Sequence, residues 1–91
     1  MKVQNMTSQN SRREVPNQFT ITDDKGDVYF QSYRTIIAKI EYSTGKTYLD
    51  SNSWDYSKTT GKYRNQFLGL NKKETEEQIK TGEIILTNLN S

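Results

Sequence analysis

The sequence predicts an α+β fold, with a small antiparallel sheet of about five strands and one or two helices packed on one face. Two observations predict it. Between residues 17 and 49, apolar and polar residues alternate with the period of a β-strand, and clusters of turn residues interrupt the alternation. Beyond residue 54, apolar residues recur with the spacing of a helix. We expect residues 17–91 to form a single domain.

The first two strands are indicated by alternating aromatic and aliphatic residues. Phe19 and Ile21 alternate with threonines, and Val28 and Phe30 alternate in the next run. Between them, residues 23–26 (Asp-Asp-Lys-Gly) have the composition of a tight turn. The pattern therefore predicts a hairpin with one buried face.

The third and fourth strands follow the same rule. Residues 34–42 alternate with period two, residues 43–45 (Ser-Thr-Gly) form a turn, and residues 46–49 continue as a short strand. On this reading Tyr29 and Tyr48 lie on the outer face of the sheet, opposite the buried positions.

A helix is expected to end near Gly69. Tyr56, Thr60, Tyr63 and Phe67 stand at i, i+4, i+7 and i+11, which places them on one helical stripe. Such a stripe more often packs in a core than binds a ligand, although the same aromatics also have the composition of a stacking surface for bases. The sequence leaves these two interpretations open.

Capping residues mark the ends of both helices. Ser57 or Asp55 can cap the first helix, and Asn71 with Glu74 three residues later fits a capping box for the second. Gly82 fits the left-handed position that ends a helix.

The two ends of the chain are predicted to differ. Residues 1–16 are rich in Asn, Gln, Ser and Arg without periodicity, and we interpret them as a flexible N-terminal arm. Residues 83–89 (EIILTNL) are expected to return to the sheet as a strand.

Composition excludes several functional classes. The chain has no cysteine and no histidine, so it cannot by itself build a disulfide, a cysteine nucleophile, a Ser-His-Asp triad or a typical zinc centre. No pair of carboxylates has a spacing that indicates acid–base catalysis. We expect no enzyme, no cofactor and no metal site. The sequence has no membrane-spanning run either, and a cytoplasmic location is the default expectation.

Two glycine-containing stretches invite comparison with a phosphate-binding P-loop. Residues 43–47 (STGKT) lack the required first glycine, because position 40 is Ile, and the chain continues as a strand. Residues 59–62 (TTGK) fail the same template. This second stretch has two open interpretations: a nest of donors for an anion, or a helix cap beside a solvated lysine.

Positive charge is concentrated in residues 54–73, which hold five cations against one acidic residue, Asp55. Such a local excess attracts phosphates or acidic proteins. The candidate ligand- or partner-binding residues are Lys58, Thr59, Lys62, Arg64, Lys72 and Lys73, with Trp54, Tyr29 and Tyr48 as aromatic contacts. We expect Lys58, Thr59, Lys62 and Arg64 to point outward from the helix.

Several segments resemble a family of small, largely uncharacterised bacteriophage proteins. They are YFQSY at residues 29–33, IIA at residues 36–38, WDYSKTTGKYRN at residues 54–65, FLG at residues 67–69 and ET at residues 74–75. The similarity covers residues 18 to about 86. It implies a phage origin and no particular activity.

Two functions follow as hypotheses. By analogy with other small phage proteins, the first is a non-enzymatic inhibitor or modulator of a host protein, such as a nuclease or another defence component, acting by surface occlusion. Its acidic segment 74–83 would then engage a basic channel. The alternative is a nucleic-acid or nucleotide-binding module that uses the basic segment 58–73. An accessory protein without a ligand for its surface charge is the third possibility.

Overall fold

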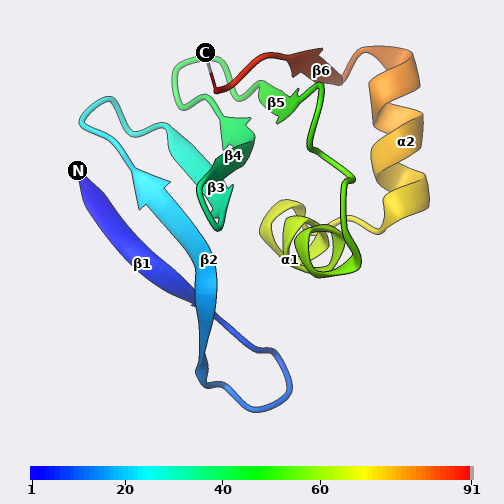
Figure 1. Ribbon diagram of the computed structural model, residues 1–91. Coiled ribbons are helices and arrows are strands. Elements are labelled where there is room, and N and C mark those ends of the chain that lie inside the picture. The colour runs from blue at the N-terminus through cyan, green and yellow to red at the C-terminus, as the bar shows by residue number, and fades with distance from the viewer. Residues whose placement is uncertain (91) are drawn as a thin grey trace.

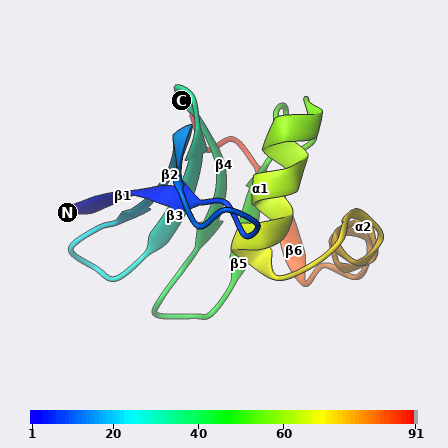
Figure 2. The ribbon, with the colours of Figure 1, turned by 90° about the horizontal axis from the view of Figure 1, so that it is seen from below.

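The computed structural model describes residues 1–90, which form a six-stranded sheet with two helices on one face (Figure 1). The strands lie in the sheet in chain order: β1 (Lys2–Thr7), β2 (Glu14–Thr22), β3 (Val28–Ser32), β4 (Thr35–Ile40), β5 (Thr47–Asp50) and β6 (Ile84–Thr87). The helices α1 (Lys58–Leu68) and α2 (Lys72–Thr81) connect β5 to β6. Figure 2 shows both helices on the same side of the sheet. The predicted α+β class is confirmed.

One strand pairing differs from the expected antiparallel sheet. Strands β1 to β5 pair antiparallel, whereas β6 runs parallel to β5. A parallel neighbour requires a long crossover connection, and the α1–α2 segment supplies it. The sheet is therefore mixed.

The expected flexible arm at residues 1–16 is wrong for most of its length. Residues 2–7 are the edge strand β1, paired along β2, which itself begins at Glu14. Met6 is buried in the core, and the side chain of Gln66 in α1 donates a hydrogen bond to the carbonyl of Thr7 (2.8 Å). The alternation was missing because an exposed edge strand is held by backbone pairing and needs few apolar side chains.

The core lies between the sheet and α1. Phe30, Ile37, Ala38 and Leu49 are completely buried, and Phe67 of α1 stacks on Phe30 with ring centroids 5.9 Å apart. The β3–β4 pairing shifts register between Phe30 and the next residue, because Ile37 is an extra residue on β4. Such a bulge allows Ile37 and Ala38, although adjacent, both to be buried.

The predicted helix ends are confirmed. The Ser57 side chain caps α1 by accepting from the backbone N–H of Thr60, and Gly69 ends the helix in the left-handed conformation. Asn71 and Glu74 form the expected capping box at α2, and Gly82 ends it at φ 84°. Tyr56 is an exception to the predicted stripe, because it precedes α1 and is half exposed.

Gln18 on β2 is a buried polar residue whose removal we expect to stabilise the fold. Its side chain is completely buried, and within residues 1–90 neither amide atom has a hydrogen-bond partner. An unpaired buried amide costs about 1–3 kcal/mol. Gln18→Leu should therefore raise the free energy of unfolding by about 1 kcal/mol in urea denaturation. A loss of stability would show that the amide is satisfied in solution.

Candidate functional site

A hollow of the described surface lies where α1 meets the start of α2. Its volume is about 900 Å³, and four of the five predicted cations line it: Lys58, Lys62, Arg64 and Lys72. We call this hollow the basic groove. Its remaining lining residues are polar or small, apart from the apolar Leu70: Gln9, Asp55, Ser57, Gly61, Asn65, Gln66, Gly69, Leu70 and Asn71. Residues from the β1–β2 connection, α1 and α2 thus meet in one concave surface.

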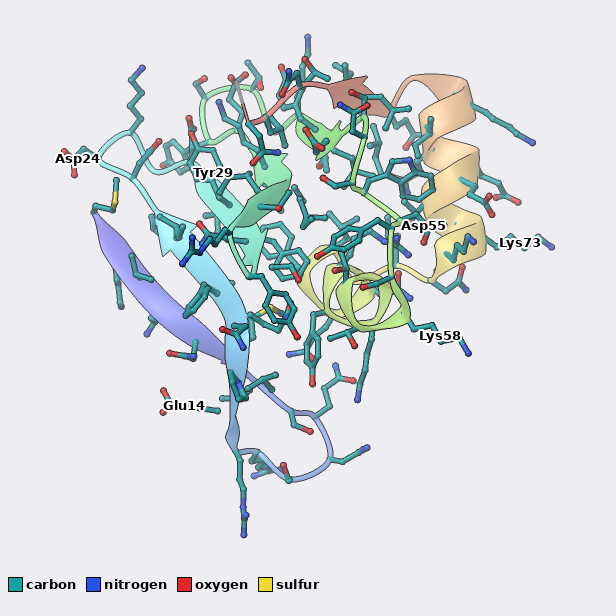
Figure 3. The ribbon with its side chains drawn as sticks, viewed as in Figure 1. Glu14, Asp24, Tyr29, Asp55, Lys58 and Lys73 are labelled. Atoms are coloured by element: carbon teal, nitrogen blue, oxygen red, sulfur yellow. The ribbon has the colours of Figure 1, made fainter. Side chains whose placement is uncertain are left out.

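Asp55 is the only acidic residue that lines the basic groove within the described part of the chain. Its carboxylate lies between the two helices (Figure 3), 3.1 Å from Nη1 of Arg64 and 2.9 Å from Nζ of Lys72. One carboxylate therefore balances part of the charge of two cations. The groove keeps an excess of positive charge.

The prediction that Arg64 points outward from the helix is wrong, because its side chain is buried. Its side chain is 1% exposed; Nη1 donates to the carbonyl oxygen of Trp54 (2.8 Å) and to Asp55, and Nη2 donates to Oδ1 of Asn65 (2.8 Å). Its guanidinium carbon lies 5.1 Å from the centroid of the Trp54 ring. Arg64 thus ties the loop before α1 to the helix. Helical spacing alone did not reveal that this loop folds over Arg64.

Lys58 and Lys62 are the charges of the groove that are not held by acidic residues. Both side chains are exposed, and the ion pairs found among residues 1–90 involve neither of them. Nζ of Lys62 lies 5.4 Å from the centroid of the Tyr63 ring. These two lysines, one turn apart on α1, are available to an anion.

Three further predicted residues contribute less to this groove. Thr59 is exposed but does not line it, and Lys73 points outward from α2, away from Asp55 (Figure 3). Trp54 is partly buried against the core, and the guanidinium of Arg64 lies over its ring. Of the two open interpretations of residues 59–62, the anion nest is not favoured, because Thr60 is buried with its hydroxyl 3.1 Å from that of Ser32.

Tyr29 and Tyr48 lie away from the basic groove, on β3 and β5. Between them stands Lys39 of β4, with Nζ 5.5 Å from the Tyr29 centroid and 6.0 Å from the Tyr48 centroid. This lysine was not selected from the sequence, although its alternation with the buried Ala38 places it on the same face of the sheet as the two tyrosines. Of the nine predicted residues, four therefore line the basic groove and two lie on strands away from it, while Thr59, Lys73 and Trp54 belong to neither group.

The ion pairs of Asp55 give the fold a defined dependence on pH. Burial alone would raise the pKa of Asp55, but hydrogen bonds and charge from Lys72 and Arg64 outweigh it and hold the pKa below the ordinary value of 3.8. Because the folded pKa is lower than the unfolded one, this stabilisation is complete above about pH 4 and is lost as pH falls through the folded pKa.

Asp55→Asn tests this linkage. We expect the variant to lose about 2 kcal/mol of unfolding free energy at pH 7, since Arg64 loses its charged partner. The difference from the parent should shrink as pH falls below about 4, because protonation then removes the same charge from the parent. Denaturation curves of both proteins between pH 2.5 and 7 measure this difference in unfolding free energy. A difference independent of pH would contradict the role given to the Asp55 carboxylate.

The family of the chain is shown by its sequence. A family model described as a family of unknown function, DUF8033, matches residues 1–83. The chain belongs to this family. The DUF8033 match includes β1 and β2, which agrees with their place in the sheet. No curated protein and no solved structure matches the chain. The bacteriophage origin implied by the resemblance stays a prediction.

Two kinds of feature are missing from the described residues. No group of three or more His, Cys, Asp or Glu residues within 1–90 is arranged to hold a metal ion. Neither described helix has the length and apolar character required to cross a membrane.

Proposed function

We propose that the protein is a non-enzymatic binding module that holds the phosphate backbone of a nucleic acid in the basic groove. The observation that carries the proposal is the arrangement of charge. Lys58 and Lys62 project without acidic partners beside a hollow whose only lining acid within residues 1–90, Asp55, is already bound by Arg64 and Lys72.

The groove has the chemistry that phosphate oxygens require. Lysines provide mobile point charges that neutralise phosphates. The first turn of α1, which carries Lys58, adds the positive end of a helix dipole to the same hollow. The amide side chains of Gln9 and Asn65 supply polar groups beside these charges.

The shape of the groove favours a chain over an enclosed small molecule. Ligand pockets for small molecules are mostly apolar and bury most of the ligand. The basic groove is lined largely by polar and charged residues, and Lys58 and Lys62 stand exposed at its side. An extended backbone can pass along such a surface with its bases directed to solvent.

Salt dependence is the test of this proposal. We expect a fluorescently labelled single-stranded oligonucleotide to bind at low salt, with an affinity that falls steeply as salt rises. Replacing one phosphate contact, by Lys62→Glu, should reduce the slope of log K against log salt by about 0.7 for a single strand or about 0.9 for a duplex. The proposal would be overturned if neither a single-stranded nor a double-stranded oligonucleotide bound at low salt, or if salt did not change the affinity.

Inhibition of a host protein is a second candidate function, and a different surface supports it. A smaller hollow of about 270 Å³ on α2 is lined by Glu74, Glu77 and Glu83, together with Gln78 and Thr81. Such a surface is complementary to the basic channel of a nuclease. Glu77→Lys with Glu83→Lys should then abolish the capture of a nuclease or defence protein that the parent protein captures. Equal capture by both proteins would contradict this role for α2.

A further inference from the structure

The register of the sheet places six side chains in one continuous row across all six strands. Each member is directly opposite the next in the strand pairing: Val3, Ile21, Tyr29, Lys39, Tyr48 and Ile85. We call this set the outer row. Its members face away from the helices, because their chain neighbours Phe30, Ala38 and Leu49 are buried in the core. The six strands that carry the row can be followed from β1 (blue) to β6 (red) in Figure 1.

The outer row is unusually apolar for a face that no helix covers. Both helices lie on the opposite side of the sheet (Figure 2). An antiparallel sheet with one packed face normally carries polar residues on the other. Here Lys39 is the one charged member, and the neighbouring row, Asn5, Phe19, Gln31 and Ile36, adds two more apolar side chains. Val3 is 56% exposed and Ile85 is 36% exposed.

The charge of Lys39 is neutralised within the chain. Its Nζ lies 3.6 Å from Oδ2 of Asp27 and also over the rings of Tyr29 and Tyr48. The lysine thereby occupies ring surface on which a base would stack. The hydroxyl of Tyr29 donates to Asp23 (3.2 Å), an acid that repels phosphate. The outer row is thus close to neutral, and it is a poor platform for nucleic acid.

We propose that the outer row is a self-association surface that a second copy of the chain covers, face to face, in a symmetric dimer. The order of residues is nearly palindromic about Lys39: a tyrosine on either side, then an isoleucine beyond each. A two-fold axis parallel to β4 places Tyr29 opposite Tyr48 of the second copy and Ile21 opposite Ile85 of the second copy. Two-fold interfaces require this kind of self-complementary surface.

Charge and core size also favour a second copy. Each Lys39 brings its own Asp27, so two copies meet without unbalanced charge, and sheets packed about 10 Å apart leave room for both ion pairs. The core on the helix side is small, with seven buried hydrophobic side chains among residues 1–90. Small domains often gain stability by burying a second apolar surface through association. This inference is independent of the nucleic-acid proposal, because the outer row shares no residue with the basic groove.

Sedimentation equilibrium of the full chain over a range of concentrations tests the proposal. We expect the parent to approach twice the monomer mass of 10.6 kDa. Ile85→Glu places a carboxylate opposite an apolar residue at two symmetric positions, and should raise the dissociation constant at least about tenfold. Ile85→Lys should act likewise, which separates loss of apolar contact from a change in net charge.

Tyr42→Glu is the matched control. Tyr42 is 77% exposed in the β4–β5 connection, outside the outer row, and its replacement should leave the dimer intact. Thermal unfolding followed by circular dichroism checks that each variant keeps its fold. A parent that remains at the monomer mass at every concentration would overturn the proposal and leave the face to a different protein. A dimer that Ile85→Glu and Ile85→Lys do not weaken would also overturn it.

Discussion

Arg64→Ala is expected to lower the free energy of unfolding by about 3 kcal/mol, the largest stability change that we predict. Arg64 is buried and donates to Trp54, Asp55 and Asn65 at once. Its removal breaks the hydrogen bonds between the loop and α1, leaves the partly buried carbonyl of Trp54 without its donor and opens a cavity. Because domains of this kind are stable by only about 5–15 kcal/mol, the midpoint of urea denaturation should fall markedly.

Two further variants make this prediction specific. Lys62→Ala removes an exposed cation from the same helix and should change stability by less than about 0.5 kcal/mol. Arg64→Lys keeps the charge but not the planar fork, and should retain only part of the stability. A cost below about 1 kcal/mol for Arg64→Ala would show that the guanidinium does not hold the loop.

Charge reversal at Lys58 and Lys62 is expected to weaken oligonucleotide binding about a hundredfold at low salt, equivalent to about 2.7 kcal/mol. Both lysines are exposed and free of ion pairs among the described residues, so the fold should not change. Two lost phosphate contacts reduce the salt slope by roughly 1.4 for a single strand. Fluorescence anisotropy at several salt concentrations measures both quantities.

The matched control reverses Lys73 and Lys80 instead. This pair changes the net charge by the same amount, and both residues are exposed on α2 outside the lining of the basic groove. Its binding should remain within a few-fold of the parent. Equal losses in the two double variants would mean that binding depends on overall charge and not on the groove.

Local sequence chemistry was sufficient to predict most of the elements. The turn at residues 23–26, the Ser57 cap and the capping box at Asn71 and Glu74 each depend on hydrogen bonds within a few residues, and all three are confirmed. The helix ends at Gly69 and Gly82 follow from the same local preference for the left-handed conformation. These features need no knowledge of the remaining chain.

Long-range contacts account for what the sequence did not reveal. Strand β1 is stabilised by pairing with β2 and by contacts of Met6 and Thr7 with the core and α1, none of which leaves a periodic pattern. Arg64 is buried because the loop before α1 folds over it. The parallel pairing of β6 likewise depends on the path of the helical crossover. In each case residues distant in sequence determine the local outcome.

The candidate site was predicted in part. The cations of residues 54–73 were recognised from charge density, and four of them do line one hollow. Their unequal roles were not predictable, because only the fold brings Asp55 against Arg64 and Lys72 and leaves Lys58 and Lys62 without acidic partners. Lys39 was missed because the strand register sets it between two tyrosines that are far apart in sequence.

Two-dimensional ¹H–¹⁵N NMR during titration with a single-stranded oligonucleotide at low salt tests most directly whether the basic groove is the binding site. We expect the largest chemical-shift changes at the backbone amides of Lys58, Gly61, Lys62 and Leu70, which lie in the groove. Amides of Tyr29 and Tyr48 on the opposite face should change little. Spectra that do not change, or changes centred on the outer row, would contradict this expectation.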